Sequence, residues 1–263
     1  MMAVLALMLT LLINGLANGL PLFGRTTGDI SGMFPNLFVP AGFTFSIWGV
    51  IYFLLALFVG EELFLSLRGK EGRVPPKARW FFFISCLANM GWILSWHALL
   101  LPLSMVVMVI LLVSLIGLFR SLNVLRNHPK LRDKVFVLWP VSVYLGWISV
   151  ATIANASALL VSMNWNGFGL APLTWTLTML TIGMLLAFLF LTLHRDVAYV
   201  LVFIWAYFGI YAARRGSFNP EEVIVARAAW VGCGIMALAL VIYLVLSLTK
   251  KRAQEFEEEK VPS

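Results

Sequence analysis

The residues best suited to recognise a small molecule are indoles, amides and phenols that lie inside apolar stretches of the chain. Trp92 and Trp96 are four residues apart, so a helix places both on one face. Asn155 is eight residues after Trp147, which puts the two within about 80° of each other around a helix axis. Aromatic faces stack on flat apolar molecules, and amides hydrogen-bond to their polar edges. The same residue types also form packing contacts and hydrogen bonds between helices, so both interpretations stay open at this point.

The chain offers little material for catalysis. Its three histidines share no metal-ligand spacing, so no metal site is predicted. His194-Arg195-Asp196 copies a fragment of a kinase motif whose other parts are missing, and we interpret it as a chance match. Cys86 and Cys233 fall in apolar stretches and are expected to be buried thiols. Neither a catalytic residue nor a cofactor is predicted.

Helices that cross a membrane must position these side chains. The 263-residue chain is 61% hydrophobic and only 12% charged, which leaves too little polar surface for a soluble domain. A spanning helix needs about 20 apolar residues. The first stretch lacks a positive n-region and an obvious cleavage site, so it is expected to be a retained helix and not a signal peptide. The pattern predicts an all-α membrane protein with about eight transmembrane helices, at residues 1–20, 41–60, 80–100, 103–119, 135–162, 173–193, 197–213 and 223–248.

Lysine and arginine are distributed unevenly between the two sides that these helices define. One side holds 15 of the 19 and the other holds 4, which are Arg25, Arg214, Arg215 and Arg227. The positive-inside rule places the richer side in the cytoplasm. We therefore expect a multi-pass integral membrane protein with cytoplasmic N- and C-termini and a charged cytoplasmic tail at 250–263. Because this rule accounts for the net charge of +7, no nucleic-acid partner is expected.

The twelve carboxylates are expected in loops, at helix ends or in the tail. Proton- and sodium-coupled pumps usually carry a buried carboxylate within a span. An ion-driven transporter is therefore not favoured, whereas facilitated movement of an apolar solute stays open.

Several aromatic and polar residues are expected together in the outer half of the membrane. These are Trp48, Trp92, Trp96, His97 and Asn155, which Asn14 and Asn18 at the outer end of the first span join. One interpretation is that the amides form hydrogen bonds between helices, since a buried amide in hydrocarbon must find a partner. The other is a pocket with aromatic walls and a few polar groups.

The outer loops carry further aromatic and charged residues. Trp165 and Trp175 flank the loop at 164–172 and are expected to be interfacial anchors. Arg214 either receives an anionic group of a ligand, or extends toward water and pairs with Glu221 or Glu222.

Three motifs occur in order along the first part of the chain. Residues 144–155 follow the pattern Y-L-x-W-x-x-x-A-x-x-x-N, residues 89–92 follow N-x-x-W, and residues 45–52 contain F…W-x-x-x-Y. Together they resemble the fifth, third and second helices of the translocator protein / tryptophan-rich sensory protein family. The chain departs from the family in a Phe45-to-Trp48 spacing that is one residue short, and in a loop at 23–40 that has no tryptophan.

The resemblance covers residues 1–166 and implies a five-helix membrane bundle there, followed by an additional three-helix membrane segment at 167–249. It also implies binding of hydrophobic ligands such as tetrapyrroles and sterols, and makes a homodimer one candidate assembly. Trp96 joins the site because it shares a helix face with Trp92. The predicted ligand-binding residues are Trp48, Tyr52, Asn89, Trp92, Trp96, Trp147, Ala151 and Asn155.

Three functions follow as hypotheses. The leading one is a protein of the lipid bilayer that binds, senses or translocates a hydrophobic small molecule such as a tetrapyrrole, a sterol or a lipid. The second is a membrane enzyme acting on a lipid or pigment, because His97 is expected close to the aromatic residues. The third is a structural or assembly partner of a larger membrane complex, which the long apolar surfaces and the charged tail suggest.

Overall fold

The computed structural model describes residues 2–20, 22–127 and 129–258, and this part of the chain is helical without a strand. The long helices are α1 (Met2–Gly19), α3 (Ile47–Leu67), α4 (Pro76–His97), α5 (Leu101–Ser121), α8 (Trp139–Ser162), α9 (Pro172–His194), α10 (Val197–Arg214) and α11 (Pro220–Glu258). Short helical segments connect them: η1 (Leu22–Gly24), α2 (Thr27–Gly32), η2 (Gly42–Ser46), α6 (Asn123–Asn127), α7 (Leu131–Asp133), η3 (Lys134–Leu138) and η4 (Gly167–Gly169). Of the predicted tail, 250–258 continues α11, and 259–263 lie outside the described residues.

Seven helices of the described chain are long and apolar enough to cross a membrane. The eighth long helix, α4, coincides with a predicted span but contains polar residues such as Asn89 and His97, which make it less apolar. Large apolar side chains are exposed along the outside of the bundle, for example Leu5, Met8 and Leu12 on α1. Lipid solvates such surfaces, whereas water does not. The prediction of an all-α, multi-pass membrane protein is confirmed.

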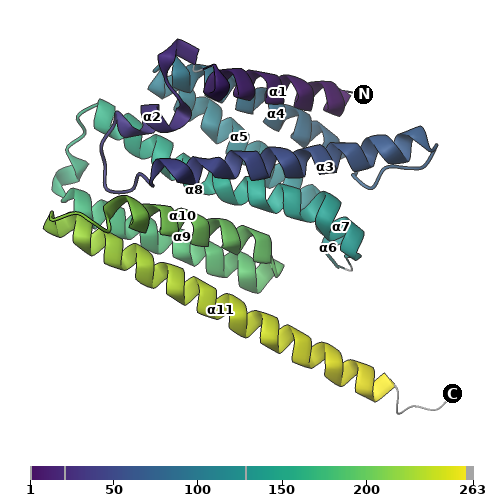
Figure 1. The fold of residues 1–263 in the computed structure, drawn as a ribbon. Helices are drawn as coiled ribbons and strands as arrows, with labels where there is room; N and C mark the ends of the chain where they lie inside the picture. Colours follow the sequence, from purple (N-terminus) through teal and green to yellow (C-terminus); the bar gives the residue numbers. More distant parts are fainter. Residues whose placement is uncertain (1, 21, 128, 259–263) are drawn as a thin grey trace.

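The long helices form two groups that meet along α8. In the first group, α4 packs against α1 and α5, α8 packs against α3 and α5, and α1 also contacts α3. In the second, α9, α10 and α11 pack against one another, and α10 contacts α8. Figure 1 shows this second group beside the first, with the two chain ends at the same end of the molecule and α2 at the other. We call the end that carries α2 the α2 end.

The segment before α3 fastens the two groups together at the α2 end. The backbone N–H of Ala41 donates to the carbonyl of Gly209 on α10 at 3.0 Å. The indole N–H of Trp205, also on α10, donates to the carbonyl of Thr44 in η2 at 2.9 Å. This close approach requires a glycine at 209, because a Cβ there would collide with the Thr44 side chain.

Ion pairs fix the opposite end of the bundle. Glu61 is buried and binds the Nε of Arg73 at 3.1 Å and the Nε of Arg132 at 2.8 Å. Arg73 also pairs with Asp133. The second predicted span ended at residue 60, but α3 continues to Leu67 because these cations satisfy Glu61 inside the helix.

A second polar contact holds the tight turn between α9 and α10. Arg126 donates to Asp196 at 3.0 Å, and the hydroxyl of Ser142 on α8 donates to the same carboxylate at 2.5 Å. Asp196 also accepts the backbone N–H of Tyr199 at 3.2 Å and so caps the first turn of α10. The carboxylate of the kinase-like tripeptide is therefore a helix cap.

A matched pair of glycine substitutions tests the joint at the α2 end. We expect Gly209→Ala to destabilise the protein by about 1–3 kcal/mol, the usual cost of overpacking. Gly234→Ala is the control, because its Cβ would meet nothing within 4 Å and alanine favours a helix. Thermal unfolding in detergent measures both variants. Equal melting temperatures for the two would contradict the described approach of η2 to α10.

Candidate functional site

Four aromatic rings from α3 and α4 form a continuous stack inside the first helix group. The ring centroids of Trp96 and Trp92 are 6.1 Å apart, those of Trp92 and Trp48 5.7 Å, and those of Trp48 and Tyr52 5.4 Å. Adjacent rings are inclined by only 22–27°. Trp147 of α8 meets Trp48 edge-on at 6.4 Å. We call these five residues the aromatic cluster.

Hydrogen bonds between helices hold the cluster in place. The indole N–H of Trp92 donates to the side-chain oxygen of Asn155 at 3.0 Å, which joins α4 to α8. The amide N–H of Asn155 also donates to the hydroxyl of Ser104 on α5 at 3.2 Å, and that hydroxyl donates its own proton to the carbonyl of Leu101 at 2.9 Å. Both Asn155 and Ser104 are buried. Asn155 therefore fixes the register of three helices.

A second amide ties three helices together one layer further from the α2 end. Asn89 accepts a hydrogen bond from Asn14 of α1 at 2.7 Å and donates to the hydroxyl of Tyr144 on α8 at 2.9 Å. All three residues are buried. The hydrogen bonds between helices that the sequence suggested are thus present in the structure.

Residues 23–40 fold over the cluster and form a lid. Thr27 is the main contact of the lid: its backbone N–H and its hydroxyl lie 3.1 and 2.9 Å from the side-chain oxygen of Asn18. The hydroxyl also lies 3.2 Å from the Nε2 of His97, and the carbonyl of Thr27 accepts the indole N–H of Trp96 at 3.3 Å. The His97 ring is thereby part of the contact between the lid and α4.

The first turn of α2 stabilises the lid itself. Thr26 and Asp29 form a capping box, in which each side chain binds the backbone N–H of the other residue. Hydrogen bonds from the Thr26 backbone and hydroxyl lower the pKa of Asp29. Because a lowered pKa keeps the carboxylate ionised, the cap is present at neutral pH and is lost on acidification.

A small gap lies between the lid and the cluster, with a volume of about 30 Å³. This is room for one or two water molecules. Six of the predicted site residues line it: Trp48, Trp92, Trp96, Trp147, Ala151 and Asn155. Tyr52 and Asn89 do not reach the gap and lie deeper. The predicted site did not include the remaining lining residues, which are Thr27, Ser31 and Pro40 of the lid, Phe45 of η2, and Val150 and Ala154 of α8.

One donor at this gap has no partner. Trp147 is buried, and its indole N–H finds no hydrogen-bond acceptor among the described residues. A buried unpaired donor costs about 1–3 kcal/mol. Trp147 is therefore a lining residue of the gap that carries a hydrogen-bond donor unused within the described residues.

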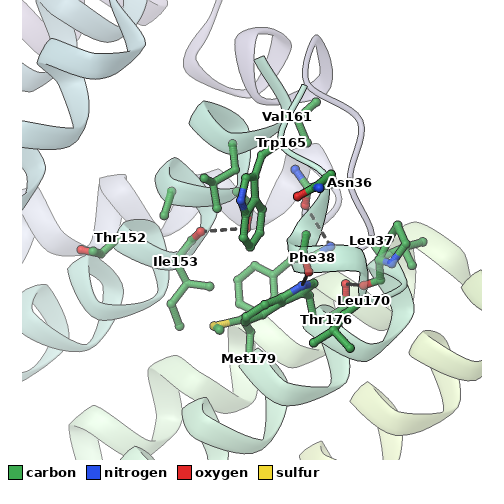
Figure 2. A pocket seen from close by; sticks show the side chains of 17 residues that line it. Asn36, Leu37, Phe38, Thr152, Ile153, Val161, Trp165, Leu170, Thr176 and Met179 are labelled. Atoms are coloured by element: carbon green, nitrogen blue, oxygen red, sulfur yellow. Dashed lines mark hydrogen bonds between the residues drawn. The ribbon is translucent and has the colours of Figure 1, made fainter. Parts of the chain in front are cut away.

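A larger cavity of about 460 Å³ lies on the other side of α8, between α8, α9 and the lid. We call it the outer cavity. Figure 2 shows Ile153, Phe38, Trp165 and Met179 gathered around this space. Its walls are Asn36, Leu37, Phe38, Thr152, Ile153, Ala156, Ser157, Leu160, Val161, Trp165, Asn166, Gly167, Leu170, Pro172, Trp175, Thr176 and Met179.

The outer cavity was not predicted from the sequence. Trp165 and Trp175, which were expected to be interfacial anchors, pack at 5.3 Å and both line it. The sequence feature that marked this region was the position of these two tryptophans on either side of a short loop that contains Asn166 and Gly167.

Arg214 holds the lid against the second helix group. It is 7% exposed, and its guanidinium donates to the carbonyls of Val39 and Asn36, each at 2.7 Å. The sequence analysis considered an anionic ligand group or a glutamate as the partner of Arg214. In the structure its hydrogen-bond partners are instead backbone carbonyls of the lid. The lid is thus bound to α4 on one side and to α10 on the other.

Comparison with known proteins assigns the family. A family model described as TSPO-like protein matches residues 1–243. The chain belongs to the TSPO-like protein family. This confirms the family resemblance, and the match runs on through 167–243, beyond the five-helix part that carries the motifs. Comparisons with curated proteins and with solved structures gave no match.

The amide that links α1, α4 and α8 yields a stability prediction. Asn89→Ala removes two hydrogen bonds between helices, the one from Asn14 and the one to the Tyr144 hydroxyl, so we expect a loss of about 1–3 kcal/mol. Leu87→Ala on the same helix is the control, because Leu87 is 49% exposed. Thermal unfolding in detergent compares the two. A smaller effect for Asn89→Ala than for Leu87→Ala would show that the amide is dispensable.

Proposed function

We propose that this membrane protein binds an uncharged hydrophobic small molecule beneath the lid, against the aromatic cluster. The observation that carries the proposal is the unpartnered indole N–H of Trp147, buried at a gap that stacked aromatic rings line. A ligand with a carbonyl oxygen or a ring nitrogen would accept this hydrogen bond. Its flat apolar body would stack on Trp48 or Trp92.

Charge narrows the class of ligand. The residues that line the gap include neither an acid nor a base. A charged ligand group buried there would lack a counter-ion, which is costly in a medium of low dielectric constant. A neutral molecule is therefore favoured over an anion or a cation. Tetrapyrroles and sterols, the ligands that the resemblance implies, are the first classes to test in uncharged form.

Binding requires the lid to move, because the gap of about 30 Å³ is far smaller than the ~300–1,000 Å³ of typical small-molecule sites. The contacts to break are few. On the side of the first helix group, the described polar contacts of the lid centre on Thr27, which meets Asn18, Trp96 and His97. His97 in this account holds the closed lid and has no role in chemistry. We also propose that movement of the lid couples ligand binding to sensing or translocation.

A titration of the protein in nanodiscs tests the proposal. Protoporphyrin IX dimethyl ester is the uncharged probe, and tryptophan quenching reports binding. We expect saturable binding. Trp147→Phe is expected to weaken the affinity about five-fold, which corresponds to the loss of one hydrogen bond. Asn155→Ala is expected to weaken the affinity as well. Trp230→Phe is the control, since Trp230 is 54% exposed on α11.

The controls separate two ways in which the proposal would be wrong. Binding that does not saturate would indicate partition into lipid. Saturable binding of equal strength in Trp147→Phe and Trp230→Phe would place the ligand elsewhere. Circular dichroism checks that each variant is folded.

We also propose that both termini face the cytoplasm. The support is the excess of lysine and arginine, 15 against 4, on the side that carries the termini. We expect Glu71→Cys, in the loop after α3, to resist a membrane-impermeant maleimide in intact cells, and Phe218→Cys, before α11, to react. The native Cys86 and Cys233 are buried. The reverse labelling pattern would invert the orientation.

A further inference from the structure

We propose that the outer cavity is a second binding site, separate from the aromatic cluster, for an uncharged amphiphile whose polar group is a hydroxyl. The cavity measures about 460 Å³, within the ~300–1,000 Å³ range of sites that hold drug-sized molecules. It opens next to Val161 and Leu170, which are 36% and 50% exposed, so a molecule can reach it from outside the bundle.

The walls of the outer cavity are held in place before any ligand arrives. The indole N–H of Trp175 donates to the carbonyl of Gly167 at 2.9 Å, which fixes the ring against the loop. Gly167 has a φ of +64°, and a Cβ there would lie 3.1 Å from the indole nitrogen, so this loop geometry suits glycine. On the lid side, Asn36 accepts the backbone N–H groups of Phe38 and Val39.

The lining excludes charged ligands. Its residues comprise aliphatic and aromatic side chains, hydroxyls and two amides, with no acid and no base. A carboxylate, a phosphate or an ammonium group would therefore be desolvated without a counter-ion. This argues against fatty acids, amines and phospholipid headgroups as occupants.

The hydroxyls of the lining favour a hydrogen-bond donor on the ligand. Ser157 of α8 donates to the carbonyl of Ile153 at 2.9 Å, and Thr176 of α9 donates to that of Pro172 at 2.9 Å. A hydroxyl has one proton and two lone pairs, so each of these oxygens can still accept but no longer donate. An alcohol on an apolar body meets this requirement, whether it is a long-chain alcohol, an acylglycerol or a sterol.

Photolabelling in phosphatidylcholine nanodiscs tests the site. The probe is octadecanol with a mid-chain diazirine, and stearic acid with the same diazirine is its charged counterpart. We expect the alcohol to label peptides that contain residues 152–179 or the lid, with saturation and with competition by unlabelled octadecanol. The acid is expected to label these peptides at least five-fold less. Unlabelled diacylglycerol and sterol in the competition arm distinguish the three alcohol classes.

Two matched pairs of variants sharpen the result. Ala156→Phe fills the cavity and is expected to abolish saturable labelling, whereas Leu185→Phe, on the exposed face of α9, is expected to leave it intact. Ser157→Ala removes an acceptor and is expected to weaken labelling about five-fold. Ser162→Ala removes a hydroxyl from the same helix outside the cavity and is expected to have no effect.

The outcomes that overturn the inference are distinct from those that concern the aromatic cluster. Labelling spread evenly over lipid-facing helices, equal labelling by the acid, or full labelling in Ala156→Phe would each refute the second site. Trp147→Phe serves as the cross-check. Because Trp147 lies at the other site, this substitution is expected to leave alcohol labelling unchanged. If Trp147→Phe and Ala156→Phe both reduce labelling equally, the two sites are one.

Discussion

The hydrogen bond from the Trp92 indole to the Asn155 side chain is the contact on which the rest of the site depends. Lipid offers no partner to a polar group, so each buried amide and indole of a membrane bundle must be satisfied within the protein. Asn155 meets this need by binding α4 and α5 from α8. Trp92 stacks on Trp48 and on Trp96 with ring planes inclined by 27° and 25°, and the stack presents an aromatic wall to the lid. Trp147, which belongs to the same cluster, is left with an unused donor.

Helix α8 connects the two cavities because its opposite faces line them. Ala151, Ala154 and Asn155 face the gap under the lid, and Ile153, Ala156 and Ser157 face the outer cavity. The lid is shared in the same way, with Pro40 at the gap and with Leu37 and Phe38 at the outer cavity. Arg214 holds this part of the lid by donating hydrogen bonds to the carbonyls of Asn36 and Val39. A molecule in the outer cavity would therefore rest against the same segment that has to move for the gap to open.

Helical periodicity explains which parts of this arrangement could be predicted from sequence. Residue spacing placed Trp92 with Trp96 on one helix face and Trp147 near Asn155 on another. The family resemblance implied that both faces and Ala151 belong to one site, and all five residues line one gap. The two tryptophans beside the loop at 164–172 marked the region of the outer cavity, but its size and position could not be predicted, because they depend on the distance between α8 and α9 and on the path of the lid. Neither this distance nor this path follows from the spacing of residues along a helix. The end of α3 was misplaced for a similar reason: Glu61 signals a loop by itself, but Arg73 and Arg132 accommodate it inside the helix. Arg214 was expected at the α2 end, but its carbonyl partners depend on where the lid lies.

The most direct test of a ligand beneath the lid is ¹⁹F NMR of the protein labelled with 5-fluorotryptophan. The signal of Trp147 is assigned by its loss in Trp147→Phe, and those of the exposed Trp80 and Trp230 are assigned likewise. On addition of protoporphyrin IX dimethyl ester, we expect the Trp147 signal to shift saturably while the Trp80 and Trp230 signals stay in place. An unmoved Trp147 signal at a ligand concentration that saturates binding would contradict this expectation.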